Sequence, residues 1–531
     1  MKSSATLSRR AKVVGVATAT VAALALAPAG AAIAAPGSQG CENRNNNTIA
    51  SLLACVDADG AREHLEALQE IADENGGNRA AGLPGYEASV EYVVDTLEAA
   101  GWNVTIDEFD YTFIGPSELD QLTPVQASYE TGAFSGSGSG EVTGNVIPVD
   151  INLTGDRAST SGCEASDFAG LNWSGPADIA LVQRGSCNFG DKAFFAEQAG
   201  AEAVIIFNQG NTPDREGLIV ADASSRTDGT PVTHGIPVVG ASFQQGVALS
   251  AAGSTARVFV PAPEQRPQKN VIAELPGKNT QNVVMAGAHL DSVQAGPGIN
   301  DNGSGSASLL EVAQNLSKLK PQNTVRLAWW GAEEDGLLGS AAYVAGLSQA
   351  EKDRIALYMN FDMVASPNYI FMVYDGDESG FPAPVTVPEG SVQIEDLFES
   401  YFTSVGQPYD DAEFSGRSDY EAFILNGIPA GGLFTGAEVV KTAEQESIWG
   451  GVAGESYDQC YHAACDTIDN INMEALDVNI DAIAMAILAY SYSTESVNGV
   501  PGKNIPGGLK LPAPAGPEGT VGSDGGHSHD S

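Results

Sequence analysis

Histidine and carboxylate side chains follow one another in a fixed order along the second half of the chain. The sequence contains six histidines, and two of them stand among acidic residues, His289 in AGAHLDSV and His462 in CYHAACD. Between these two blocks lie Asp301 in GPGINDNGSGS, the adjacent Glu333 and Glu334 in WWGAEEDGLLGS, and Asp362 in MNFDMV. A mixed set of imidazole and carboxylate donors suits zinc. The residue types therefore predict a metal centre.

The positions of these residues strengthen that prediction. We expect strands at NVVMAGAH, TVRLAWWG and ALYMNFDM, alternating with helices at residues 306–319 and 338–346. The acidic groups then lie at the C-terminal ends of strands, the edge of an open α/β sheet at which ligands bind. Taken singly, an Asp after a strand is usually a turn or a helix cap. Gathered at one edge, however, the carboxylates would repel one another without cations, and two metal ions balance them better than one.

This ordered series resembles the two-zinc leucyl aminopeptidase family of metallopeptidases, in its secreted Streptomyces-type form. The blocks AHLDS, DNGSGS, AEEDGLLGS and CYHAACD carry the resemblance, which covers residues 60–125 and 265–495. It implies that Asp301 bridges two zinc ions, with His289 and Asp362 on one ion and Glu334 and His462 on the other. It also implies an exopeptidase that removes the N-terminal residue of peptides and proteins with a free N-terminus, with a preference for large apolar residues.

The resemblance also implies roles for side chains that do not bind metal. Glu333 is expected to act as the general base on a water shared by the ions, whose pKa two zinc ions lower toward about 7. Tyr461 is expected to donate to the developing oxyanion, and Arg417 in SGRSDYEAF to help hold the substrate. Asp291 is expected to orient a ligand histidine, and the peptide bond after Asp301 is expected to be cis.

Residues 1–34 are typical of a signal peptide, with basic residues, then an alanine-rich apolar run, then small residues. Arg9 and Arg10 also fit a twin-arginine route, but Lys12 favours the general secretory route. We therefore expect a secreted, extracellular protein and take it to be a monomer. No later segment reads as a membrane span. The net charge of -43 argues against nucleic acid as a partner, because that field repels phosphates.

The cysteines fall into couples that are close in sequence. An even number in an exported chain favours disulfides, although the sequence does not fix their connectivity, and a zinc-binding cysteine set is the weaker alternative because no C-x-x-C spacing occurs. The couple at Cys460 and Cys465 brackets Tyr461 and His462, so a bond there would restrict both. The other two couples are Cys41 with Cys55 and Cys163 with Cys187.

Composition divides the chain into four parts. Residues 35–125 and 265–495 are expected to form a discontinuous zinc aminopeptidase domain, a mixed, mainly parallel sheet sandwiched by helices (the zinc-exopeptidase fold). Residues 126–264 are expected to form an inserted, β-rich domain whose segment LVQRGSCNFGDKAFFAEQAG resembles the protease-associated (PA) domain. A structural insertion is about as good a reading of it as a module that shields the site or guides larger substrates. Residues 496–531, rich in Gly and Pro, are expected to be a disordered tail.

Three other functions are left open. A metallocarboxypeptidase or deacylase of related fold shares the order of ligands, and a glutaminyl-cyclase-like acyltransferase uses a similar scaffold. A receptor-like protein that has lost catalysis combines the same two domains, but it should lack zinc ligands that are present here. Separately, Asp477 and Asp481 have helical i, i+4 spacing and are candidates for a calcium site, although a solvated acidic helix face is the simpler account.

Overall fold

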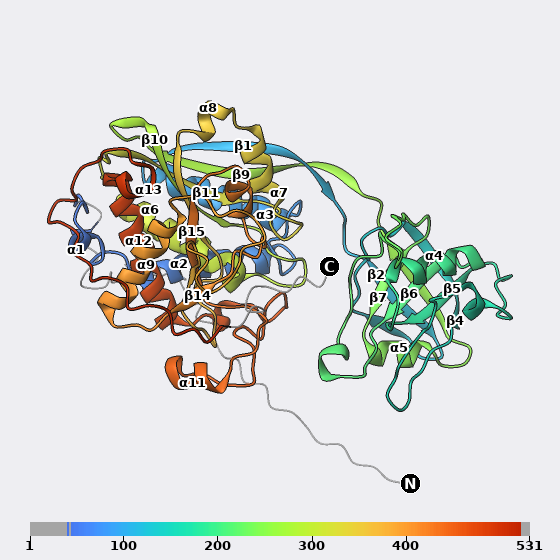
Figure 1. The fold of residues 1–531 in the computed structure, drawn as a ribbon. Helices are drawn as coiled ribbons and strands as arrows, with labels where there is room; N and C mark the ends of the chain where they lie inside the picture. The colour runs from blue at the N-terminus through green and yellow to red at the C-terminus, as the bar shows by residue number, and fades with distance from the viewer. Residues whose placement is uncertain (1–39, 42–43, 522–531) are drawn as a thin grey trace, which may run out of the picture.

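The computed structural model describes residues 40–41 and 44–521, in two lobes that each contain one β-sheet (Figure 1). The two lobes are joined by the extended strands β1 (Asn103–Phe113) and β9 (Glu264–Leu275), which pair with each other along their length. The expected signal peptide at residues 1–34 lies outside the described residues.

The first sheet has the strand order β1-β9-β11-β10-β12-β15-β13-β14. Its central strands β11, β10, β12 and β15 run parallel, whereas β1 and β9 are antiparallel at one edge and β13 is antiparallel to β15. This confirms the expected mixed, mainly parallel sheet. The strands not yet located are β10 (Asn279–His289), β11 (Asn323–Trp330), β12 (Ile355–Phe361), β13 (Met372–Tyr374), β14 (Asp410–Ala412) and β15 (Ala430–Phe434).

Apolar side chains on both faces explain why this sheet is covered by helices. Every residue of β12 is buried, as a parallel strand with helices on each side requires. Helices α2, α6, α12 and α9 pack against one another, and α7 packs against β1 and β9. The longer helices are α2 (Ala58–Glu74), α3 (Pro84–Ala99), α6 (Gly305–Leu316), α7 (Leu338–Gly346), α9 (Ser391–Val405) and α12 (Met473–Tyr492). The shorter ones are α1 (Ile49–Leu52), α8 (Gln349–Lys352), α10 (Glu421–Ile424), α11 (Ala443–Trp449) and α13 (Glu495–Asn498).

The second sheet lies in the chain between β1 and β9 and has the order β3-β2-β8-β4-β5-β6-β7. Because β2 already belongs to this sheet, the inserted lobe begins before the expected boundary at residue 126. Its strands are β2 (Glu118–Thr123), β3 (Ala127–Tyr129), β4 (Gly140–Pro148), β5 (Asp178–Gln183), β6 (Ala203–Phe207), β7 (Val238–Ala241) and β8 (Thr255–Val260). Its helices are α4 (Phe189–Ala199) and α5 (Phe243–Leu249).

The prediction of a disordered tail is wrong for residues 496–521. This segment begins with α13 and then lies along the first lobe, where Ile505 is 8% exposed and Leu509 and Leu511 pack against the core. The carboxylate of Asp410 accepts hydrogen bonds from the N–H groups of residues 519–521. A Gly- and Pro-rich composition prevents a segment from forming a core of its own, but not from packing on an existing one.

The cysteine couples form three disulfides, Cys41–Cys55, Cys163–Cys187 and Cys460–Cys465, as expected from their proximity in sequence. Within residues 40–41 and 44–521, no helix combines the length and the apolar character needed to cross a membrane.

Candidate metal centre

The predicted site residues lie together at the C-terminal edge of the first sheet. His289 is the last residue of β10, Glu333 and Glu334 follow β11, and Asp362 directly follows β12. Asp301 belongs to the turn η4 (Ile299–Ser304), which leads into α6, and the Asp301–Asn302 peptide bond is cis, as expected. The sheet topology therefore brings together His289 and Asp362, which are 73 positions apart in the sequence.

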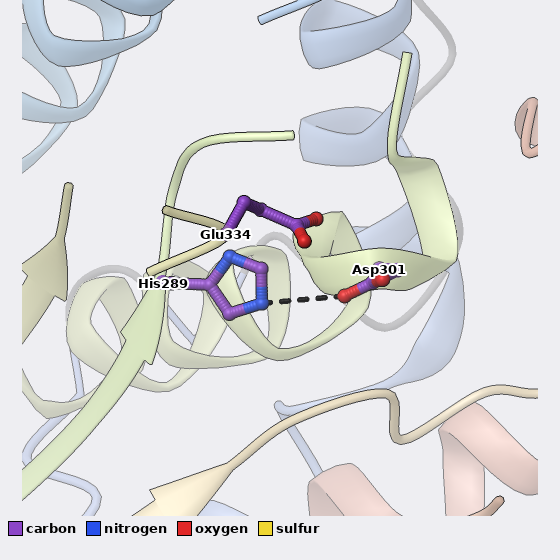
Figure 2. Close-up of side chains that lie close together, drawn as sticks. All are labelled: His289, Asp301 and Glu334. Atoms are coloured by element: carbon purple, nitrogen blue, oxygen red, sulfur yellow. Dashed lines mark ion pairs between the residues drawn. The ribbon is translucent and has the colours of Figure 1, made fainter. Parts of the chain in front are cut away.

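Asp301 lies between the two imidazoles. Its Oδ1 is 3.2 Å from Nε2 of His289, and its Oδ2 is 3.3 Å from Nε2 of His462. Nε2 of His289 is also 3.4 Å from Oδ1 of Asp362, while Nε2 of His462 is 2.9 Å from Oε2 of Glu334. Figure 2 shows His289, Asp301 and Glu334 converging from three separate segments. Each oxygen of Asp301 thus faces a different group of donors.

Two buried carboxylate oxygens of this cluster lack a hydrogen-bond partner, Oε1 of Glu334 and Oδ1 of Asp362. Burying an ionised carboxylate without a partner is costly, and a cation is the usual compensation. Ligand atoms of His289, Asp301 and Glu334 all lie within 4.8 Å of one another, and so do those of His289, Glu333 and Asp362. The donor set and its unsatisfied oxygens therefore fit divalent metal ions such as zinc.

The electrostatics of the cluster favour positive charge. Burial alone would lower the pKa of His462, but the adjacent Glu334 and Asp301 raise it to about 11. Burial alone would raise the pKa of Asp301, but hydrogen bonds from His289 and His462 hold it below its ordinary value. The field that retains protons on the imidazoles also attracts a divalent cation, which can replace them.

Glu333 differs from its neighbour in its surroundings. It is 8% exposed, and its Oε2 is 4.0 Å from Nε2 of His289. Burial raises its pKa well above the ordinary value despite the opposing effect of His289, and Asp362 adds to the rise. Burial and Asp362 thus both favour the protonated form of this carboxyl group.

The Asp291 carboxylate connects β10 to the segment after β11. Its Oδ1 accepts a hydrogen bond from the N–H of Glu333 and its Oδ2 one from the N–H of Glu334, at 3.2 and 3.3 Å. The same Oδ1 is 3.7 Å from Nδ1 of His289. Asp291 is fully buried, so this geometry is fixed by packing. It lies where a residue that orients His289 should lie.

The loop closed by the Cys460–Cys465 disulfide carries two of the candidates, Tyr461 and His462. The ring of Tyr461 stacks on the imidazole of His462, with centroids 3.8 Å apart. His462 has a φ of +54°, a left-handed conformation that is unfavourable for a side chain with a Cβ and is concentrated at functional sites. Burial raises the pKa of Tyr461 well above 10, so its hydroxyl stays protonated and can donate.

Arg417 lies close enough to the cluster for its charge to act on Tyr461. Its side chain is 11% exposed, and its Nη1 is 3.4 Å from Oε1 of Glu438. Burial lowers the pKa of Arg417, whereas Tyr461, Glu438 and Glu333 raise it. The structure thus places Arg417 among the residues that surround the site.

Sequence reasoning missed Arg79, a fully buried arginine beside the centre. Its guanidinium donates to the backbone carbonyls of Leu290, Pro297 and Gly298, in the loop that joins His289 to Asp301. Burial lowers its pKa to about 10, so it keeps its charge at neutral pH. Gly298 has a φ of +63°, and a Cβ there would lie 2.4 Å from the carbonyl oxygen of Asp301. Arg79 follows the Gly-Gly-Asn of a loop, where nothing in a single sequence separates it from a surface arginine.

Sequence reasoning also missed Asp466, the last residue of the quoted block CYHAACD. Its Oδ1 accepts from the N–H of Asn300 and its Oδ2 from the N–H of Asp301. Asn470 donates to Oδ1 of Asp466 and to Asp458, which also accepts from the amide of Asn300. This buried network holds Asp301 against the disulfide-closed loop. The signal available was its place directly after that loop.

Asp477 and Asp481 are only candidates for a calcium site, the simpler account being a solvated acidic helix face. Oδ1 of Asp477 accepts a hydrogen bond from the N–H of Ala58, and burial, Asp477 and Asp57 raise the pKa of Asp481 to about 7. Neither aspartate belongs to a tight group of three metal-ligand atoms within the described part of the chain.

Comparisons with known proteins agree with this geometry. Residues 270–487 match peptidase family M28, and residues 142–249 match the PA domain. The chain is 48% identical over 462 residues to an aminopeptidase of Pseudomonas aeruginosa, across 85% of this chain and 84% of that protein. It is 40% identical over 435 residues to leucine aminopeptidase 2 of Trichophyton tonsurans, across 81% and 83% of the two chains. Among solved structures it is similar to BSAP, a zinc aminopeptidase from Bacillus subtilis, with a TM-score of 0.61 and 26% identity over 81% of this chain and 94% of that one. The chain therefore belongs to peptidase family M28, as a metallo-aminopeptidase with an inserted PA domain.

Proposed function

We propose that this chain is an exported aminopeptidase that binds two zinc ions at the C-terminal edge of its first sheet. The observation that carries the proposal is the position of Asp301, whose two oxygens face His289 and His462 separately. Asp301 would bridge the ions, with Asp362 completing the His289 side and Glu334 the His462 side. Zinc ions at such a site supply Lewis acidity and lower the pKa of a bound water.

The surrounding side chains would perform the proton transfers. Glu333 takes a proton from the attacking water and passes it to the leaving amine, for which its burial and raised pKa suit it. Tyr461 donates a hydrogen bond to the developing oxyanion from its place against His462. Asp291 holds the imidazole of His289 and the backbone of Glu333 in one arrangement. Arg417 helps to hold the substrate.

The proposed substrate is a peptide or protein with a free N-terminal amine and a large apolar first residue. A free α-ammonium group is attracted by the carboxylates that surround the site, and acetylation removes that charge. The apolar preference is supported by the relative named leucine aminopeptidase 2. Export is supported by the three disulfides and by the signal-peptide pattern of residues 1–34. We take the active unit to be a monomer.

One experiment tests the proposal. Zinc content should be measured on purified protein, together with the rate of hydrolysis of a free and an N-acetylated leucyl peptide. We expect two zinc ions per chain, hydrolysis of the free peptide alone, loss of the rate in a strong chelator and recovery with zinc. Full activity without zinc would refute the metal centre. Cleavage of the acetylated peptide would favour a deacylase or carboxypeptidase, and pyroglutamate formation from an N-terminal glutamine would favour a cyclase.

A further inference from the structure

A cleft of about 810 Å³ lies between the two lobes and opens onto the metal centre. Glu334 and His462 line its inner end, and residues 130–137 of the PA domain line the opposite wall. The linker residues 114–117, which join β1 to the inserted lobe, also line it. A cleft of this size is within the usual range for ligand sites. It is continuous with the centre and is shared by both lobes.

The two sides of the metal centre differ in their access to this cleft. The His289 side is closed, since that side chain is 1% exposed, and Asp362 is likewise buried at 4%. The His462 side chain is 31% exposed and forms part of the cleft wall. An aminopeptidase retains one residue before the scissile bond, whereas the rest of the substrate extends away from the centre. The open side is therefore the side from which the following residues can leave.

The lining of the cleft has a distinct chemistry. Its charged residues are Glu130, Glu334 and Asp335, and no lysine or arginine lines it. Two apolar side chains remain exposed there, Ile114 on the linker at 45% and Val220 on the PA domain at 42%. Exposed aliphatic side chains in a concave site gain free energy when a ligand covers them. Glu334 is 2.9 Å from Nε2 of His462, so the carboxylates left to repel an acidic ligand are those of Glu130 and Asp335.

We propose that this cleft binds the substrate residues that follow the scissile bond, and that the PA domain thereby selects peptides whose second to fourth residues are apolar rather than acidic. The proposal rests on the aminopeptidase function argued above. Val220 contacts an apolar downstream side chain from the PA side, and Ile114 contacts one from the linker. Glu130 and Asp335 disfavour Asp and Glu at the same positions.

Substrates with and without downstream residues separate this proposal from the basic activity. The zinc-loaded enzyme should be given leucine p-nitroanilide, which has no amino acid after the scissile bond, and two pentapeptides, Leu-Ala-Phe-Phe-Ala and Leu-Ala-Asp-Asp-Ala. We expect kcat/KM to be at least about tenfold higher for the apolar pentapeptide than for the acidic one. Equal values for the two peptides would overturn the proposed selection.

Variants then locate the selection in the cleft. Val220→Asp should lower kcat/KM for the apolar pentapeptide about three- to tenfold, mainly through KM, and leave the anilide rate unchanged. Ile114→Asp, on the other wall, should act in the same direction. Val247→Asp is the matched control, because Val247 is 36% exposed on α5 of the same lobe but does not line the cleft, and it should change none of the rates.

The possible failures are distinguishable. If the zinc-loaded enzyme hydrolyses neither the anilide nor the peptides, the proposed function itself fails. If it hydrolyses all of them but Val220→Asp and Ile114→Asp behave like Val247→Asp, only the proposed role of the cleft fails. An equal fall in the anilide and peptide rates would also overturn it, because the effect would then not depend on downstream residues.

Discussion

The N–H of Asp301 donates a hydrogen bond of 3.0 Å to Oδ2 of Asp466. Oδ1 of the same carboxylate accepts a hydrogen bond from the N–H of Asn300. One buried side chain therefore holds the N–H groups of two consecutive residues, Asn300 and Asp301. Asp466 also follows the disulfide-closed loop that carries His462. It therefore couples the position of Asp301 to that of His462 across the centre.

Replacing Asp466 by Asn should weaken metal binding. An amide offers one acceptor oxygen, so either the N–H of Asn300 or that of Asp301 loses its partner and faces a donor instead. Loss of an outer partner of a metal site typically costs 10- to 100-fold in metal affinity. We expect a fall of that order in zinc affinity, measured by competition with a chelator. Asp469→Asn, at a nearby exposed position, should keep the wild-type affinity. Unchanged affinity in Asp466→Asn would contradict the coupling.

Glu333 and Glu334 are adjacent but are assigned different tasks. Glu333→Gln should retain both zinc ions while turnover falls by about 10² to 10⁴, because a positioned base is lost. Glu334→Gln should lose zinc affinity, since a neutral group replaces a carboxylate 2.9 Å from His462, and excess zinc should partly restore its rate. Zinc stoichiometry and rate, measured on both variants, check the assignment. If Glu333→Gln loses metal and recovers with added zinc, the two roles are reversed, and Glu333 then binds metal together with His289 and Asp362.

The Cys460–Cys465 disulfide should matter more for activity than for stability. It closes a loop with a sequence separation of 5, and short loops contribute little to the chain entropy that a disulfide removes. The loop does, however, fix both Tyr461 and His462. We expect the double Ser variant to lose about tenfold in kcat/KM while its Tm falls by only a few degrees. Replacing Cys163 and Cys187, far from the centre in the PA domain, is the control. A variant that melts much earlier yet keeps its rate would argue against this view.

Glu311 should make stability depend on pH. It is 6% exposed on α6, and burial together with Asp57 raises its pKa from 4.5 to about 8. Between about pH 4.5 and 8 the unfolded chain is therefore ionised at this position while the folded chain keeps the proton, so the contribution of Glu311 to stability falls as the pH rises.

Glu311→Gln should remove this dependence. The variant should have a higher Tm than the wild type at pH 9 and the same Tm at pH 4. The difference at pH 9 should correspond to about a few kcal/mol in unfolding free energy. Thermal melts across this pH range provide the measurement. Glu70→Gln, at an exposed position of α2, is the control and should follow the wild type. A difference that does not vary with pH would show that the effect arises from packing rather than from ionisation.

The sequence predicted the parts of this structure that depend on local patterns. Apolar runs located β10, β11 and β12, and the ends of those runs located His289, the Glu333–Glu334 pair and Asp362 at one edge. What it missed depends on contacts between distant segments. Arg79 acts through backbone carbonyls some 210 positions away, and no residue pattern encodes such a contact. The tail was misread because its composition describes how it would behave alone, not on the surface that Asp410 provides.

Phe113 pairs with Glu264 at the end of the antiparallel β1–β9 ladder. The chain leaves the first sheet and returns to it at neighbouring points of two antiparallel strands, so the PA domain occupies the place of a hairpin turn. Antiparallel strands need only a short connection. The first sheet therefore keeps every one of its strand pairings whatever connects β1 to β9, and the inserted lobe adds no strand to it.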